Sequence, residues 1–199
     1  MDNLYHQMKD ILKIELRNIK STNEYDDIVL NYKEIVKYFD KNIRNNIDGL
    51  TKQEFINFFQ LVKTYRKGRI QIQPSLRDFE NTKYYLKKLV DENISDVWKL
   101  ENIVTSNKGI KGMQKTGPTI LLHFYKPHKF SIWNTVIKSK LDEEGYFKEL
   151  DYVRTSPTYT PWNEMQKKLA KDLKTNLWII EILWNRCKNE IYDGFGAKP

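Results

Sequence analysis

The chain has 199 residues, of which 40% are hydrophobic and 13% aromatic, and it carries a net charge of +8. This composition suffices for a packed core and excludes a disordered chain. The positive charge favours a polyanionic partner, although abundant Lys, Asn and Ile with almost no Ala is also what a biased genome composition produces.

Several kinds of site and location are excluded by what the sequence lacks. No apolar run reaches the roughly 18–20 residues that span a bilayer, and the N-terminus has no signal-peptide pattern. The single cysteine, Cys187, excludes an internal disulfide and fits a reducing compartment. His6, His123 and His128 form no ligand cluster, which argues against a zinc site or an iron–sulfur cluster. We therefore expect a cytoplasmic protein without a metal or other cofactor.

Apolar residues recur at helical spacing along nearly the whole chain, and no segment shows the alternation of a strand. The spacing predicts helices over 3–20 and 25–46, and Gly49 ends the second. Thr51 and Glu54 form a capping box that opens a third helix. Beyond it come a basic turn, Arg66-Lys67-Gly68-Arg69, and an irregular stretch, 70–74.

The second half of the chain continues the helical pattern. Ser75 and Ser95 are the predicted N-caps of the next two helices. Later helices are predicted over 115–125, ended by Pro127, and from just after Asn134. Thr160 is the predicted N-cap of a helix that has Pro161 at its first helical position and ends at about residue 174, and a last helix is predicted over 176–190. We therefore predict an all-α protein of about ten helices, with an N-terminal helical lobe at 1–75 and a second lobe at 76–199.

Residues 108–134 contain a glycine turn that leads into an apolar helix. Gly109 and Gly112 allow positive φ or close approach of the backbone, and Ile110 and Met113 can anchor the turn in the core. Backbone N–H groups at the start of the helix, with lysines around them, favour a phosphate oxygen. The residues predicted to bind phosphate are Gly109, Lys111, Gly112, Met113, Gln114 and Lys115. The alternative is a plain helix–turn–helix connection with a glycine cap.

Three stretches of this segment follow one family pattern. They are a hairpin, Ile110-Lys111-Gly112-Met113-Gln114-Lys115; a helix, Pro118 to Leu122; and a loop, Tyr125-Lys126-Pro127 to Phe130-Ser131-Ile132-Trp133. They resemble the Leu-Pro-Gly-Val-Gly hairpin, following helix and aspartate loop of the helix-hairpin-helix superfamily of DNA glycosylases. Asn134 stands 22 residues after Gly112, the offset of the catalytic aspartate in endonuclease III-type enzymes.

This likeness is clear over residues 95–140 and weaker through Tyr159, Asn163 and Trp178. An uncharacterised branch with asparagine at the catalytic position is also similar. The resemblance implies a two-lobed all-α fold with a cleft, in which the N-terminal helix often joins the C-terminal helices. It implies binding to double-stranded DNA, base flipping and hydrolytic removal of the flipped base. We expect a monomer.

Three departures from the family pattern limit the chemistry. Gln114 replaces the second hairpin glycine, which reduces the expected backbone contacts to phosphate. Thr116 stands where bifunctional members have the lysine that attacks the sugar, so a Schiff-base lyase step at that position is excluded. Asn134 replaces the catalytic aspartate.

Whether the protein is an enzyme or a binding protein depends on what Asn134 can do in place of the aspartate. An amide cannot take up a proton at pH 7, but it can orient a water by donating and accepting hydrogen bonds. Asparagine is also a favoured N-cap, so the residue can be a cap alone or a cap that contacts substrate. Glu101 and Asp151 are possible replacement carboxylates, although nothing in their spacing selects them.

The remaining candidates each have a structural alternative. Trp133 can stack on a flipped base and His123 can line the base pocket, but both also fit core packing. Arg66, Lys67 and Arg69 can contact DNA phosphates or form a solvated basic turn.

These observations give three hypotheses on function. The first is a monofunctional DNA glycosylase that acts in base repair or in defence against DNA with modified bases. The second is a catalytically inactive protein of the same fold that reads modified or distorted DNA. The third is a helical protein-interaction domain whose charge reflects base composition. Salt-dependent binding to duplex DNA separates the first two from the third.

Overall fold

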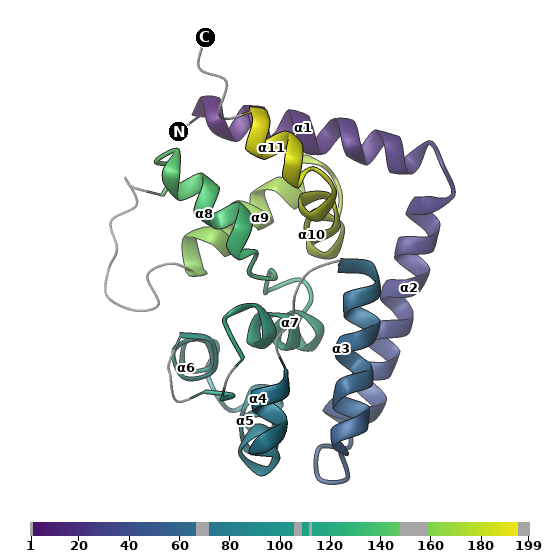
Figure 1. Cartoon of the computed structure of the whole chain (residues 1–199), viewed down its shortest axis with the longest axis vertical. Coiled ribbons are helices and arrows are strands. Elements are labelled where there is room, and N and C mark those ends of the chain that lie inside the picture. The colour runs from purple at the N-terminus through teal and green to yellow at the C-terminus, as the bar shows by residue number, and fades with distance from the viewer. Residues whose placement is uncertain (1, 67–71, 106–108, 112, 148–158, 195–199) are drawn as a thin grey trace. The chain divides into compact units, whose positions relative to one another are not determined.

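The computed structural model describes residues 2–66, 72–105, 109–111, 113–147 and 159–194 (Figure 1). Every regular element in these residues is a helix, which confirms the predicted all-α class. None of the described helices is long and apolar enough to cross a membrane. The first eight elements are α1 (Asp2–Lys20), α2 (Glu24–Phe39), the π-helix η1 (Asp40–Arg44), α3 (Lys52–Arg66), α4 (Gln73–Arg77), α5 (Phe79–Val90), α6 (Asp96–Lys99) and the π-helix η2 (Leu100–Thr105). The last five are α7 (Thr116–Tyr125), α8 (Thr135–Glu143), α9 (Tyr159–Asp172), α10 (Leu177–Arg186) and α11 (Lys188–Gly194).

Local sequence explains several helix starts. The predicted capping box forms, because Thr51 N–H donates to Glu54 Oε2 at 2.8 Å and Glu54 N–H donates to Thr51 Oγ1 at 3.2 Å. Ser95 caps α6, as expected, by accepting the backbone N–H of Trp98. Asn176 caps α10 in the same way.

Other expected boundaries are wrong. Ser75 lies inside α4, where its hydroxyl donates to Ile72 O at 2.6 Å, and Asp78 caps α5 instead. Gln73 and Pro74 are helical rather than irregular, since proline suits the first turn of a helix. Thr160 is not the N-cap that was expected, because α9 begins at Tyr159 and Thr160 lies inside it. The single helix expected over 25–46 is α2 followed by the π-helix η1.

The chain forms two compact units that are not contiguous in sequence. One unit holds residues 1–29 and 131–199, and the other holds residues 30–130. The N-terminal helix therefore belongs with the C-terminal helices, and the division does not follow the expected boundary between 75 and 76. The backbone passes from one unit to the other within α2 and again after Phe130.

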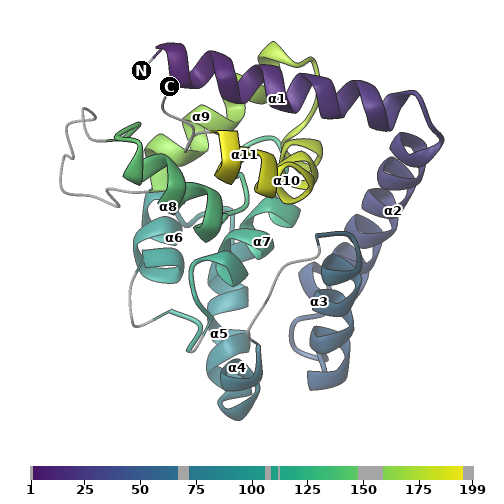
Figure 2. The same ribbon diagram turned by 45° about the horizontal axis from the view of Figure 1, so that its top comes forward.

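In the unit of residues 1–29 and 131–199, α1 packs against α10 and α11, and α10 packs against α9 (Figures 1 and 2). Three tryptophans from α9 and α10 are almost fully buried there: Trp162, Trp178 and Trp184. The indole N–H of Trp184 donates to Gln166 Oε1 at 2.7 Å. The two ends of the sequence thus share one aromatic core.

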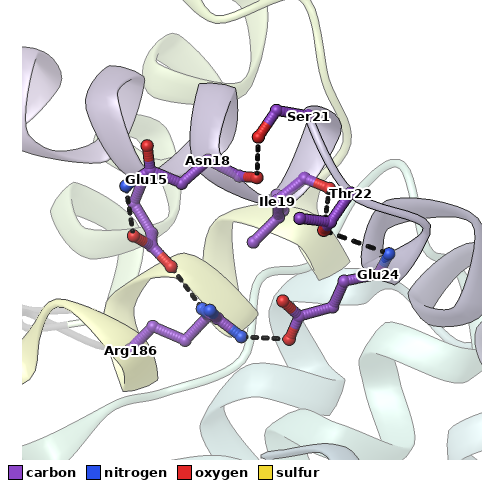
Figure 3. Close-up of polar contacts among 7 residues, drawn as sticks. All are labelled: Glu15, Asn18, Ile19, Ser21, Thr22, Glu24 and Arg186. Atoms are coloured by element: carbon purple, nitrogen blue, oxygen red, sulfur yellow. Dashed lines mark hydrogen bonds and ion pairs between the residues drawn. The ribbon is translucent and has the colours of Figure 1, made fainter.

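Arg186, the last residue of α10, ties this core to the beginning of the chain. Its guanidinium makes ion pairs with Glu15 of α1 and with Glu24, the first residue of α2 (Figure 3). The turn between α1 and α2 is closed by Ser21 Oγ donating to Asn18 O at 2.8 Å. These contacts fix the direction in which the chain leaves α1.

In the unit of residues 30–130, α2 and α3 lie side by side and antiparallel (Figures 1 and 2). Tyr38 OH donates to Glu54 O at 3.1 Å, and the rings of Phe39 and Phe58 are 5.5 Å apart. Phe124 of α7 contacts both rings, at 6.3 Å and 5.5 Å. All residues of α7 from Gly117 to Tyr125 are buried. The helix that follows the hairpin is therefore the apolar centre of this unit.

Candidate nucleic-acid interface

The turn before α7 is anchored in the unit of residues 30–130 by apolar side chains. Ile110 is 3% exposed and Met113 is 8% exposed, and Met113 N–H closes the turn by donating to Ile110 O at 3.1 Å. A Cβ on Gly109 would lie 2.6 Å from Ile103 O, so only glycine lets the chain pass this close to η2. Gly109 therefore serves close approach of the backbone.

The polar groups of the hairpin are at the surface. Lys111 is exposed, and its ammonium lies 3.3 Å from Asp78 Oδ2. Gln114 is exposed as well, and its backbone N–H has no acceptor among the described residues. An exposed ion pair is worth about 0–1 kcal/mol. A phosphate oxygen can therefore displace Asp78 from Lys111.

The start of α7 offers fewer free donors than its sequence suggests. Gly117 N–H donates to Gln114 O at 2.9 Å, and Thr119 N–H donates to Lys115 O at 3.1 Å. Pro118 has no N–H. The half-buried Lys115 occupies the N-cap position without a side-chain cap bond. Direct binding of an anion by the hairpin thus falls mainly to Lys111 and the Gln114 N–H.

Some predicted residues cannot be placed. Gly112, Lys67, Arg69 and Asp151 lie outside the described residues. Arg66 ends α3, but its side chain is outside them too.

His123 is a core residue of the same unit. It is 1% exposed, and Nδ1 lies 2.8 Å from Phe130 O. Because a carbonyl oxygen only accepts, Nδ1 carries the proton of a neutral ring. Burial lowers the pKa of His123 to about 4. The ring also packs against Tyr32 and Phe124, so core packing is favoured over a place in a base pocket.

Three cations surround Tyr125 at the end of α7, a cluster that sequence reasoning missed. The Lys99 ammonium lies 4.6 Å from the ring centroid, the Lys126 ammonium 5.1 Å, and the Arg44 guanidinium carbon 5.4 Å. Lys99 is fully buried, and this burial lowers its pKa. Carboxylates pair with the other two cations: Asp96 and Glu92. The cluster is therefore close to electrical balance and stabilises the negative end of the helix.

Asn134, in the unit of residues 1–29 and 131–199, is the N-cap of α8. Its Oδ1 accepts from Ile137 N–H at 3.3 Å, and the residue is 5% exposed. Its amide nitrogen makes no hydrogen bond with a described residue. Because Asn134 Oδ1 accepts the hydrogen bond of the cap, the amide NH₂ group is what remains for other partners, and it is a donor. Such a group can hold an oxygen of a water, a sugar or a phosphate, but it cannot take up a proton.

The loop before α8 is held by side chains of α9 to which sequence reasoning assigned no role. Tyr159 OH donates to Ser131 O at 2.6 Å, and Ser131 N–H donates to Asn163 Oδ1 at 2.7 Å. Trp162 Nε1 donates to Ile132 O at 2.9 Å. The three side chains share one helix face because they are three and four residues apart. These bonds fix the path of the chain into the N-cap of α8.

Trp133 packs in the same core. It is 6% exposed, and its ring centroid lies 5.9 Å from that of Trp162 and 6.4 Å from that of Tyr159. The ammonium of Lys138 is 6.0 Å from the Trp133 ring and pairs with Asp142 one turn further along α8. Core packing is therefore favoured over base stacking for Trp133.

The candidate residues belong to different units, and the charge is divided between those units. The hairpin and His123 are in the unit of residues 30–130, whereas Trp133 and Asn134 are in the other. Residues 30–130 hold 19 of the 34 Lys and Arg but only 10 of the 26 Asp and Glu, which gives +9 for that unit and −1 for the other. The basic excess therefore accompanies the hairpin and not Asn134.

Comparison with known proteins gives no match to a family model, to a curated protein or to a solved structure. Among the described residues, no group of three or more His, Cys, Asp or Glu side chains is placed to hold a metal ion.

Proposed function

We propose that this protein binds duplex DNA through the unit of residues 30–130, with the hairpin at 109–115 against the phosphate backbone. The division of charge carries the proposal, because a unit with a net charge of +9 attracts a polyanion whereas a unit of −1 does not. A genome-wide bias toward lysine would raise the charge of both units, so composition alone does not account for the difference.

The hairpin geometry supports the same proposal. Buried Ile110 and Met113 hold the turn, while exposed Lys111 and the Gln114 N–H offer a charge and a donor at its tip. A fixed backbone donor beside a lysine is a common arrangement for phosphate. A glycosylase-like fold is part of the proposal, supported by the all-helical class and by the packing of α1 with α10 and α11.

The test compares two charge reversals, Lys111→Glu and Lys167→Glu. Each removes a lysine from a surface ion pair: the exposed Lys111 from its pair with Asp78 in the basic unit, and the half-buried Lys167 from its pair with Glu164 in the other. We expect Lys111→Glu to weaken duplex binding roughly tenfold near 100 mM salt, and Lys167→Glu to leave it nearly unchanged. Fluorescence anisotropy with a labelled duplex measures both. Equal effects of the two variants would argue against the hairpin, and no duplex binding by the wild type would refute the function itself.

Hydrolytic removal of a damaged or modified base is a second candidate function. The observation that favours it is the hold on the loop before Asn134, whose backbone accepts from Tyr159 and Trp162 and donates to Asn163. A catalytic group needs such a fixed approach, because small displacements cost large factors in rate. A binding protein of the same fold, without chemistry, does not need it.

A further inference from the structure

A row of lysines runs along α2 and η1 in the basic unit. Lys33, Lys37 and Lys41 are four residues apart, and all three are exposed. A helix rises about 1.5 Å per residue, so the row covers about 12 Å. Residues 30–69 hold nine Lys and Arg against four Asp and Glu, so more than half of the +9 of this unit lies in the α2–α3 half of it.

Lys33 and Lys37 form no ion pair with a described residue. Other lysines of the unit do, since Lys83 lies 3.6 Å from Glu80 and Lys87 pairs with Asp48. The hydrogen bonds from Thr51 are the main reason that the pKa of Glu54 is lowered, and Lys41 adds only a smaller effect. The charge of the row is therefore available to a partner.

The helix dipole explains only the last lysine of this row. Acidic residues occupy the first turn of α2, as the dipole favours: Glu24, Asp26 and Asp27. The dipole stabilises cations in the last turn of a helix, and Lys41 lies in the last turn of η1. Lys33 and Lys37 do not, because the helical run continues to Arg44, about two turns beyond Lys37.

The same helix offers a membrane no continuous apolar face, because Leu30 is the one large apolar side chain of α2 that is exposed. Ile35, Phe39 and Ile43 repeat at the same spacing on another face, and all are 0% exposed in the core of the unit. A membrane-surface helix needs both a basic face and a free apolar one. A basic face alone fits the phosphates of a nucleic acid.

We infer that Lys33, Lys37 and Lys41 form a second phosphate-contact surface for duplex DNA, in addition to the hairpin. The inference rests on the proposed DNA-binding function and extends the contact to a helix that the family resemblance does not include. Each phosphate neutralised by a lysine releases counterions, so each contact contributes a slope of about −0.9 to the plot of log K against log salt concentration.

The test compares two double variants: Lys33→Ala with Lys37→Ala, and Lys13→Ala with Arg17→Ala. The control pair is matched, because Lys13 and Arg17 are also exposed, four residues apart on α1 and without an ion pair among the described residues. Alanine favours helix at all four positions, and unchanged circular dichroism and urea midpoints establish that both variants fold. We expect the Lys33/Lys37 variant to reduce the magnitude of the salt slope by about 1.8 and the control to leave it unchanged.

Four other outcomes overturn the inference. An equal reduction of the salt slope in both double variants would mean that only the net charge of the protein matters and that these lysines form no specific DNA-contact surface. No loss in the Lys33/Lys37 variant, while the wild type binds duplex, would place the DNA contact elsewhere. If the Lys33/Lys37 variant lost binding to anionic phosphatidylserine vesicles but still bound duplex as the wild type does, the row would be a membrane-contact surface. A wild type that binds no duplex would remove the proposed function together with this surface.

Discussion

Asn134 is the residue at which binding and chemistry separate. Its Oδ1 is engaged with Ile137 N–H as a helix cap, and its amide nitrogen is the remaining polar group. A carboxylate at this place would offset the positive end of α8 and stabilise positive charge on a departing sugar. The neutral amide does neither, so the native residue suits contact with an oxygen better than bond cleavage.

Replacing Asn134 by aspartate tests whether the loop is arranged for base removal. Aspartate is an equally favoured N-cap and matches the helix dipole, so Asn134→Asp should fold at least as stably as the wild type. If the loop faces a flipped base, the added general base should raise excision about a hundredfold or more. The measurement is alkali-sensitive cleavage of duplexes that carry a panel of damaged and modified bases.

Asn134→Ala is the control, since it removes both the cap and the amide. An Asn134→Asp protein that makes no more abasic sites than Asn134→Ala would show that this loop is not a catalytic centre. Duplex binding would be unaffected by that result, because its proposed residues lie in the other unit.

His123 gives the protein a predictable dependence on pH. Burial lowers the pKa of His123 in the folded protein to about 4, against an ordinary value of 6.5. Below pH 6.5 His123 takes up a proton in the unfolded chain, whereas in the folded protein it stays neutral until about pH 4. The contribution of His123 to the free energy of unfolding is therefore complete above pH 6.5 and is lost as the pH falls toward 4. We expect a loss of about 2 kcal/mol between pH 7 and pH 5. In His123→Asn, which keeps a donor near Phe130 O, that part of the dependence should vanish; urea unfolding at both pH values checks it. Identical pH dependence in the two proteins would contradict a buried neutral ring.

At the scale of the elements, the helix caps that depend on neighbouring residues could be predicted from the sequence. The capping box at Thr51, the cap at Ser95 and the cap at Asn134 depend only on residues within one turn, and all three form. Ser75 is not an N-cap because it lies inside the short helix α4, which begins at Gln73 and has Pro74 in its first turn. Asp78, with φ −120° and ψ 70°, separates α4 from α5. Ser75 and Asp78 are both residue types that favour an N-cap, so local sequence alone does not distinguish them.

Elements that depend on distant residues could not be predicted in this way. In the π-helices η1 and η2 each backbone hydrogen bond spans five residues instead of four, and no local sequence signal predicts this. Tyr159, Trp162 and Asn163 could be placed on one helix face from their spacing. Their partners, Ser131 and Ile132, are about thirty residues earlier, so only the folded chain reveals the hold on the loop.

At the scale of the whole molecule, the division of charge depends on units that are not contiguous. A boundary at residue 75 does not reveal this difference in charge, because residues 30–75 belong to the same unit as the hairpin and residues 131–199 belong to the same unit as α1. Drawn by the fold, the units carry +9 and −1. The excess of nine charges is therefore a property of one body of the protein, and that body is the proposed DNA-binding surface.

The most direct test of this account is the affinity of the wild-type protein for a short duplex as salt is raised from 50 to 200 mM. If Lys111 and the lysines of α2 together neutralise at least three phosphates, the slope of log K against log salt concentration should be about −2.7 or steeper, and affinity should fall roughly fortyfold. Absence of binding at 50 mM salt, or an affinity that salt does not change, would contradict DNA binding by the unit of residues 30–130.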